Sequence, residues 1–258
     1  MTPTLADPSA AAGIRIDSVT LARGGRRIFD RLSLLLKEPR IGLVGDNGAG
    51  KSTLFRLICG LDQPQQGQVL VHGCDARTER QRLSQCVSLM FQNPDDQIIF
   101  PTVLEELAFT LTARGESRQH ARRRAGDFLA RRGLAAWGER AIGELSQGQR
   151  QQVCLLALQI GEPRTLLLDE PFASLDLLSQ ARLAAQLRDT GQQIVFATHA
   201  LEHVRDFERV LWMERGAVRA DGPGREVCAA YAEDVRSRIG AASTEPLARC
   251  DELQHAHA

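Results

Sequence analysis

The 258-residue sequence predicts an α/β fold with a central parallel sheet, an antiparallel β edge and an inserted α-helical subdomain. Short apolar runs separated by helical patterns predict the parallel sheet, because strands that are buried on both faces consist mostly of hydrophobic residues. Alternating apolar and polar residues near the start predict the antiparallel edge. A stretch without any such run, residues 93–158, predicts the helical subdomain.

The elements are expected in a simple order along the chain. Residues 1–12 carry Asp7 and no apolar stretch, so they predict a flexible tail and do not resemble a secretory signal. Residues 13–222 are expected to form the main domain, and residues 223–258 a helical segment followed by a flexible tail. The segments expected as edge strands are 14–22 and 27–36, and the central strands are expected at 41–44, 87–90, 166–168 and 194–197.

Composition and charge argue against several classes of partner. The formal net charge at pH 7 is zero, so no nucleic acid is expected as a partner. The apolar runs are far shorter than the roughly 18 residues that are needed to span a bilayer. The six cysteines contain no CxxC pair, which argues against a disulfide or zinc framework and favours the cytoplasm. Cys250, His255 and His257 lack metal-ligand spacing and are interpreted as part of a solvated tail.

The segment "GDNGAGKST", residues 45–53, joins an expected strand to an expected amphipathic helix. It fits the pattern G-x-x-x-x-G-K-[ST], in which glycines let the backbone aim its N–H groups at a phosphate beside the helix N-terminus. Lys51 is expected to reach the β- and γ-phosphates, and the Ser52 hydroxyl to ligate Mg²⁺. Alone, this phosphate loop fits kinases, GTPases and transport ATPases alike. The residues expected to bind the nucleotide are Gly45, Asp46, Asn47, Gly48, Ala49, Gly50, Lys51, Ser52 and Thr53.

An acidic pair follows a later strand in "TLLLDEP". Asp169 ends this apolar run, where open α/β sheets place their ligand sites, and it is suited to holding Mg²⁺ through water. Glu170 is expected to take a proton from an attacking water, a role that contributes about 10²–10⁴ in rate. Such a pair is often only solvated, but the phosphate loop favours the catalytic interpretation.

The segment "LSQGQ", which begins at Leu145, supports two interpretations. Ser146 and Gln149 fit a capping box at the start of a helix. The same geometry presents the Ser146 hydroxyl and the Gly148 N–H as donors for an anion at a helix N-terminus.

These motifs together resemble the ATP-binding-cassette ATPases over nearly the whole chain. The ordered set also includes Gln92 in "MFQNP", "SLD" at Ser174 to Asp176, and His199 in "FATHA". The resemblance implies a P-loop NTPase core of the RecA-like type and a nucleotide-dependent, head-to-tail dimer with two ATP molecules between the subunits. The resemblance further implies that Gln92 contacts Mg²⁺ and the attacking water and that His199 contacts the γ-phosphate. It implies that Asp176 couples the two sites. The residues implied to act on the partner's ATP are Ser146, Gln147, Gly148 and Gln149.

Three departures from the family pattern bear on these roles. Gln147 stands where the family most often has glycine, although Ser146 and Gly148 remain. Arg23 occupies the place of the adenine-stacking aromatic residue; a guanidinium plane also stacks on a base, so Arg23 is expected to bind the nucleotide with weak base selectivity. The connection "LLLKEPRIGLVG" lacks the usual Pro-Gly turn and is shortened.

The segment "FQNPDDQIIFPTVLEELAFTL", residues 91–111, resembles the energising subunits of energy-coupling-factor importers. That resemblance implies two membrane partners, a transmembrane coupling subunit and a substrate-binding subunit, and a peripheral location on the cytoplasmic face of the cell membrane. Within this segment, Thr102 and Glu105 are expected to cap a helix. The shortened entry to the phosphate loop and the segment 206–222 favour biotin as cargo, with cobalt or nickel as the alternative. A soluble assembly or repair ATPase is the competing class, and a homodimer and a heterodimer both remain open.

Overall fold

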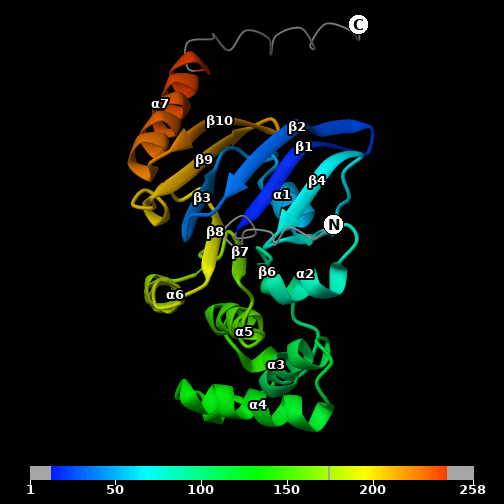
Figure 1. Ribbon diagram of the computed structural model, residues 1–258. Helices are drawn as coiled ribbons and strands as arrows, with labels where there is room; N and C mark the ends of the chain where they lie inside the picture. Colours follow the sequence, from blue (N-terminus) through cyan, green and yellow to red (C-terminus); the bar gives the residue numbers. More distant parts are fainter. Residues whose placement is uncertain (1–12, 174, 243–258) are drawn as a thin grey trace, which may run out of the picture.

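The computed structural model describes residues 13–173 and 175–242, which form two sheets and a helical layer (Figure 1). The tail 1–12, Ser174 of the "SLD" motif, and Cys250, His255 and His257 lie outside the described residues. The six-stranded sheet has the order β10-β9-β3-β8-β7-β6, and the four-stranded sheet the order β2-β1-β4-β5. The strands are β1 (Ile14–Arg23), β2 (Arg26–Leu36), β3 (Arg40–Val44), β4 (Gln66–Val71), β5 (Cys74–Asp75), β6 (Val87–Met90), β7 (Thr165–Asp169), β8 (Gln193–Ala197), β9 (Arg209–Glu214) and β10 (Ala217–Gly222).

The six-stranded sheet contains the four predicted central strands, which are β3, β6, β7 and β8. They pair in parallel, and most of their residues are buried, as expected for strands covered on both faces. β9 extends the parallel part beside β3, and β10 adds an antiparallel edge strand. In this arrangement β3 and β7 end at the same edge of the sheet, where the motif residues follow them.

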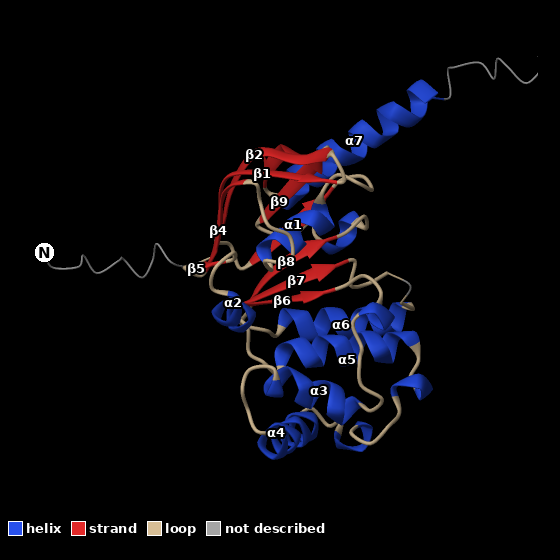
Figure 2. Ribbon diagram, turned by 90° about the vertical axis from the view of Figure 1, so that its right-hand side faces the viewer, coloured by secondary structure: helices blue, strands red, loops and turns tan. Residues whose placement is uncertain are grey.

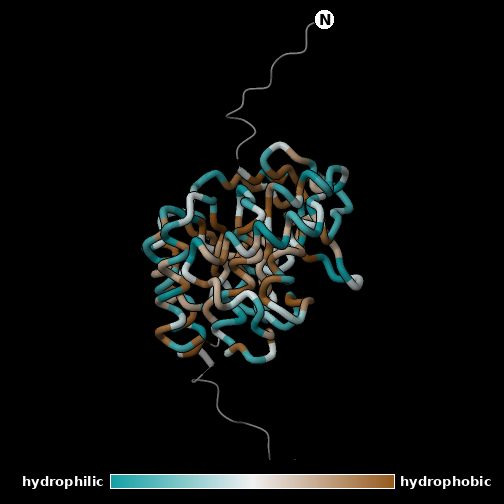
Figure 3. The backbone as a smooth tube through the Cα atoms, turned by 90° about the horizontal axis from the view of Figure 1, so that it is seen from below, coloured by the Kyte–Doolittle hydropathy of each residue, from teal (hydrophilic) through white to brown (hydrophobic). Residues whose placement is uncertain are grey.

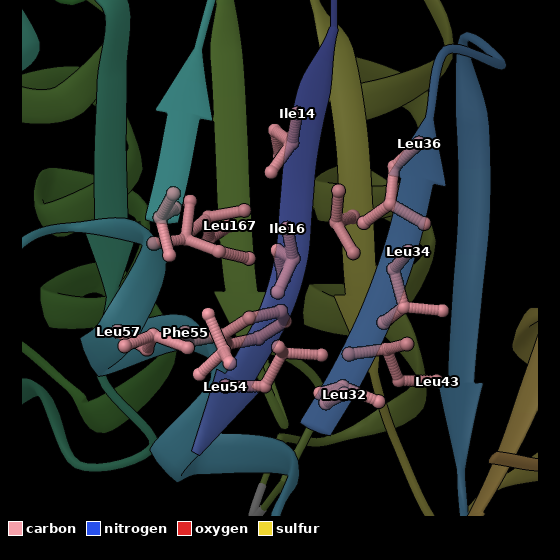
Figure 4. Close-up of a cluster of buried hydrophobic side chains, with 14 of the residues drawn as sticks. Ile14, Ile16, Leu32, Leu34, Leu36, Leu43, Leu54, Phe55, Leu57 and Leu167 are labelled. Carbon is pink, nitrogen blue, oxygen red and sulfur yellow. The ribbon is translucent and has the colours of Figure 1, made fainter. Parts of the chain in front are cut away.

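The four-stranded sheet is antiparallel, as the alternating sequence predicted. Its apolar face packs against α1 (Lys51–Ile58) and the larger sheet, and Figure 4 shows the side chains that meet there. Ile14, Ile16 and Leu36 of this sheet belong to one cluster with Leu54 and Phe55 of α1, and these side chains are almost completely buried. This apolar contact fixes the direction of α1, and therefore the position of the phosphate loop at its N-terminus.

The helical layer lies below the larger sheet and has its own apolar cluster (Figure 2). Thr102 is the N-cap of α3 (Val103–Thr112). Its hydroxyl accepts the Glu105 N–H, so the predicted cap is confirmed. Figure 3 shows apolar segments mostly in the interior and hydrophilic segments on the outside. None of the described helices is both long enough and apolar enough to cross a bilayer. The helices are α2 (Arg80–Cys86), α3 (Val103–Thr112), α4 (Arg118–Arg131), α5 (Gln147–Gln159) and α6 (Leu177–Arg188).

The last described element, α7 (Gly224–Ala242), packs beside β9 and β10 (Figure 1). The proposed domain boundary after residue 222 falls between β10 and α7. The N-terminal part of α7 buries Val227, Cys228 and Tyr231 against the sheet. Its later residues through Gly240 are mostly exposed.

Candidate nucleotide-binding site

The phosphate loop (residues 45–53) leaves β3 and enters α1 as predicted. Gly45 has a φ of 141°, and an added Cβ would lie 2.2 Å from the carbonyl oxygen of Met213, so this position accepts no side chain. Gly50, with a φ of 109°, is the N-cap of α1. The buried Lys51 donates from Nζ to the carbonyl oxygens of Gly45, at 2.6 Å, and Asp46, at 3.2 Å. The position of the Lys51 ammonium is therefore fixed by carbonyl oxygens of the same loop.

A cleft of about 260 Å³ opens over this loop and collects most of the predicted site residues. Gln92, two residues after β6, and His199, two residues after β8, both line it. The C-terminal ends of β3, β6, β7 and β8 thus converge on one cleft, because all four strands are parallel. The residues lining the cleft are Arg26, Arg27, Ile28, Asn47, Gly48, Ala49, Gly50, Lys51, Ser52, Thr53, Gln92, Asp169, Glu170, His199, Arg215 and Gly216.

The acidic pair, Asp169 and Glu170, lines the cleft. The backbone of Glu170 is in the left-handed region, with a φ of 48°, which is uncommon for a residue other than glycine. Thr198 donates to Glu170 Oε2 at 3.2 Å, and His199 Nε2 lies 3.4 Å from Glu170 Oε1. That Oε1 atom is buried and accepts no hydrogen bond among the described residues. Glu170 therefore presents an oxygen that can still accept a proton or a hydrogen bond.

The ionisable groups of the cleft carry the shifts expected of charges removed from water. Burial raises the pKa of Asp169, although a hydrogen bond from Ser52 and the charge of Lys51 oppose the shift. Burial also raises the pKa of Glu170, opposed chiefly by His199. Burial lowers the pKa of Lys51, opposed by Glu170 and Asp169. Charges interact strongly in such a low-dielectric site, so this cleft is suited to binding a compact, highly charged group.

The segment 146–149 lies outside this cleft. Its capping box is confirmed, because the Ser146 hydroxyl accepts the Gln149 N–H at 3.3 Å and Gln149 Oε1 accepts the Ser146 N–H at 3.0 Å. An added Cβ on Gly148 would lie 2.7 Å from Ser179 Oγ, so α6 requires a small residue here. Gln147 is exposed. The contacts of these four residues with a partner's ATP remain a prediction.

Asp176 is the N-cap of α6, and its carboxylate accepts the Ser179 N–H at 2.7 Å. Hydrogen bonds from Ser179 hold the pKa of Asp176 below its usual value. Its side chain is exposed, and its proposed role in coupling two sites is also still a prediction.

The predicted base-binding residue Arg23 does not line the cleft. It ends β1 at the surface and pairs in register with Arg26, which does line the cleft. Sequence reasoning missed Arg26, and also Arg215 and Gly216 of the β9–β10 turn. An added Cβ on Gly216 would lie 1.6 Å from the carbonyl oxygen of Ile28, which brings the turn against β2. These residues belong to no recognisable motif. The one signal in the sequence was Gly216, because a glycine in a short turn indicates a close approach of another part of the backbone.

Asp46 contacts a part of the chain that the motifs do not include. Its carboxylate accepts a hydrogen bond from the Tyr231 hydroxyl at 2.9 Å and pairs with the guanidinium of Arg238. Both residues belong to α7. The phosphate loop is therefore held from outside as well as by β3 and α1.

This chain is similar to known proteins over most of its length. The family model described as "ABC transporter" matches residues 30–173. A biotin transport ATP-binding protein, BioM, of Rhodobacter capsulatus is 46% identical over 230 residues, which are 88% of this chain and 98% of that protein. BioM of Rhizobium etli is 37% identical over 220 residues, with 85% and 98% covered. The solved structure of CbiO1 from Clostridium perfringens, described as part of the ABC transporter complex CbiONQ, has a TM-score of 0.73 at 25% identity and covers 90% of this chain and 98% of its own.

Proposed function

Since this chain belongs to the ABC transporter family, we propose that it is the ATP-hydrolysing subunit of an energy-coupling-factor importer whose cargo is biotin. One observation carries the choice of cargo. The chain is 46% identical to a biotin transport ATP-binding protein along 98% of that protein's length. In the proposed importer the substrate-binding subunit, and not this chain, binds the cargo.

The cleft supports in-line attack of water on a bound triphosphate. The N–H groups of the phosphate loop and Lys51 bind the phosphate oxygens, and binding this charge away from water strengthens each contact. Glu170 accepts a proton from the attacking water, and its raised pKa makes it a stronger base near neutral pH. Gln92 positions that water, and His199 donates toward the γ-phosphate.

The donor set of the cleft fits Mg²⁺. Ser52, Gln92 and Asp169 line the same cleft, and the buried Glu170 Oε1 accepts no hydrogen bond among the described residues. Hydroxyl and carboxylate oxygens are the ligands that Mg²⁺ prefers, and the ion keeps several waters. We therefore assign Ser52 and Gln92 as its ligands and Asp169 as a contact through water. When bound, the ion neutralises charge on the phosphates.

The proposed assembly has two copies of such a subunit arranged head to tail, each completing the other's ATP site. Ser146 to Gln149 of one copy would then face the phosphate loop of the other. The pair would act on the cytoplasmic face of the membrane with a transmembrane coupling subunit and a substrate-binding subunit. This arrangement gives a role to the capping segment of α5, whose exposed Ser146 lies outside the chain's own cleft.

A transport assay in vesicles tests the proposal. The chain is co-expressed with the coupling and substrate-binding subunits that its host encodes, and the complex is reconstituted with ATP on the side of this chain. Labelled biotin at nanomolar supply is expected to accumulate, and the complex carrying Glu170→Gln is expected to accumulate none. Accumulation of cobalt or nickel without biotin would reverse the choice of cargo. A chain that forms no complex with membrane subunits would instead favour the soluble class.

A further inference from the structure

The phosphate loop, which we propose binds a triphosphate, carries an acidic residue, Asp46. Asp46 directly follows Gly45, and half of its side chain is exposed. The Lys51 ammonium donates to the carbonyl oxygen of Asp46 at 3.2 Å, so the lysine charge lies beside this residue. A free carboxylate here would repel a triphosphate and compete with it for Lys51. The chain therefore needs a group that neutralises Asp46.

That group comes from α7. The Tyr231 hydroxyl donates to Asp46 Oδ1 at 2.9 Å, and Arg238 Nη2 donates to the same oxygen at 3.2 Å while Nη1 contacts Oδ2. A guanidinium that contacts both oxygens matches the shape of a carboxylate and gives a strong, oriented pair. These contacts hold the pKa of Asp46 below its usual value, so the side chain is ionised at neutral pH.

Further contacts hold α7 in place. Tyr231 is buried, and its ring meets Trp212 of β9 edge-on with 5.3 Å between the centroids. Asp234 pairs with Arg238 Nε at 2.9 Å and with Arg219 of β10 at 2.8 Å. Arg219 also stacks over the Trp212 ring. The Tyr231 hydroxyl and the Arg238 guanidinium are therefore oriented toward Asp46 by packing and ion pairs on α7, β9 and β10.

We propose that Arg238 and Tyr231 are positioning residues for ATP binding, which neutralise and hold Asp46 so that the phosphate loop and Lys51 accept the triphosphate. They contact no ATP and act through Asp46. The α7 helix is in this way part of the nucleotide site, although Arg238 follows Asp46 by 192 residues in the sequence. This role does not depend on the cargo or on the membrane partners.

Equilibrium binding of MgATP to the purified full chain tests the charge effect. The measurements use the Glu170→Gln background so that hydrolysis does not interfere. Arg238→Ala is expected to raise the dissociation constant about tenfold, which is the effect of about 1.4 kcal/mol of lost binding energy. Tyr231→Phe, which keeps the ring contact with Trp212, is expected to raise it by a smaller factor. The matched control is Arg236→Ala, which removes an exposed arginine of the same helix that pairs with Glu233 and should leave binding unchanged.

A rescue experiment separates neutralisation from simple support of the fold. In an Asp46→Asn chain there is no charge left to neutralise, so adding Arg238→Ala should leave the affinity for MgATP unchanged. In wild-type Asp46 chains, kcat should change much less than KM when Arg238 is replaced. The proposal is overturned if Arg238→Ala leaves binding unchanged, or if it weakens binding equally with Asp46 and with Asn at position 46. Should Arg238→Ala fail to fold, Arg238→Lys and Tyr231→Phe carry the same comparison.

Discussion

At the scale of single residues, the proposed mechanism gives different roles to two sets of groups in the cleft. Lys51 and the loop N–H groups are proposed to bind the triphosphate, and Glu170 is proposed to accept the proton of the attacking water. Only Glu170 combines a pKa raised by burial with an oxygen atom that accepts no hydrogen bond among the described residues. Loss of Glu170 and loss of Lys51 should therefore have different kinetic effects.

Glu170→Gln is expected to abolish turnover by a factor of roughly 10² or more while MgATP still binds. The amide keeps the size of the side chain but cannot accept the proton. Bound ATP then persists, so the variant should accumulate as an ATP-dependent dimer in size-exclusion chromatography. Phosphate release measures turnover, and Lys51→Ala, which should weaken nucleotide binding, is the comparison. Turnover at the wild-type rate would remove Glu170 from its role as base.

Base selectivity is the second residue-scale prediction. Arg26, Arg27, Arg215 and Ile28 are among the residues that line the cleft, and the lining found in the described chain includes no Phe, Tyr or Trp. Most of the affinity should then come from the triphosphate. GTP is expected to compete with ATP within roughly tenfold, since a guanidinium stacks on either purine. A preference for ATP of a hundredfold or more in a competition assay would contradict this.

The motif residues could be predicted because each lies within a few residues of a recognisable pattern. Lys51 and Glu170 follow strands whose apolar runs are visible in the sequence. Arg215, Tyr231 and Arg238 could not be predicted in this way. Their roles depend on which distant strands become neighbours, and a single arginine in a helix is usually only solvated.

At the scale of elements, the antiparallel sheet is joined to the larger sheet by a chain of polar groups. His72 Nδ1 accepts the Gly13 N–H at 3.1 Å, and His72 Nε2 lies 2.7 Å from the hydroxyl of Thr165, the first residue of β7. Thr165 donates to Gln193 of β8 at 2.7 Å. Gln193 in turn donates to the carbonyl oxygens of Leu36 and Glu38. Each donor in the chain meets an acceptor only while His72 is neutral.

This polar chain predicts a loss of stability in acid. Burial lowers the pKa of His72 from 6.5 to about 4, with a smaller contribution from Arg164. The unfolded chain therefore binds a proton below about pH 6.5, whereas the folded chain does so only near pH 4. The free energy of unfolding should fall between these values, by on the order of 1–2 kcal/mol after allowance for the partial exposure of the ring.

His72→Asn isolates this contribution, because asparagine tolerates the positive φ of 49° at this position. The variant should be less stable than wild type at pH 8. The difference between the two proteins should shrink as the pH falls from about 6.5 to 4, as urea unfolding at each pH would show. A constant difference would mean that His72 does not titrate in this range.

The segment after β6 is expected to act in coupling. Ile99 is 70% exposed, and its N–H is held by the buried Glu106 carboxylate at 2.9 Å. Ile99→Ser should reduce biotin uptake by reconstituted vesicles more than it reduces ATP hydrolysis, because the side chain lies outside the ATP cleft. Leu61→Ser, at another exposed apolar residue, is the matched control. Equal loss of uptake and hydrolysis would show that the segment only supports Gln92.

The sequence predicted β3, β6, β7 and β8 because their apolar runs are unbroken. It did not predict β9 and β10 as strands. In β9 the unbroken apolar run at residues 210–213 was a signal that sequence reasoning missed, and Arg209 at its start is paired with Glu38 and Asp221. In β10 charged residues interrupt the pattern, and this strand forms by pairing with β9, a tertiary contact that is not visible in local periodicity.

At the scale of the whole molecule, our proposal is that one chain carries two halves of an ATP site that do not meet within that chain. The cleft is lined by the phosphate loop and its neighbours, whereas Ser146 and Gly148 lie outside it. A head-to-tail pair brings the two halves together twice, because a two-fold axis repeats every contact.

Mixing two inactive variants tests this arrangement. Lys51→Ala removes the phosphate contact and Ser146→Arg blocks the capping segment, so each variant alone should hydrolyse almost no ATP. A mixed pair has one site in which both halves are intact. With independent sites and random pairing, the mixture should recover about a quarter of the wild-type rate. If both halves acted within one chain, mixing would restore nothing.

The neighbours of β3 have a consequence for how the protein is made. β1 and β2 pair through a short turn and can form a hairpin while synthesis continues. β3 has β8 and β9 beside it, and Arg40 at its start contacts the backbone of Gln192, 152 residues later. During synthesis the nascent chain therefore holds β3 without either partner, an exposed state that slows folding and invites aggregation. The ATP-binding loop is made early in translation, yet it takes its final shape only after β8 and β9 have left the ribosome.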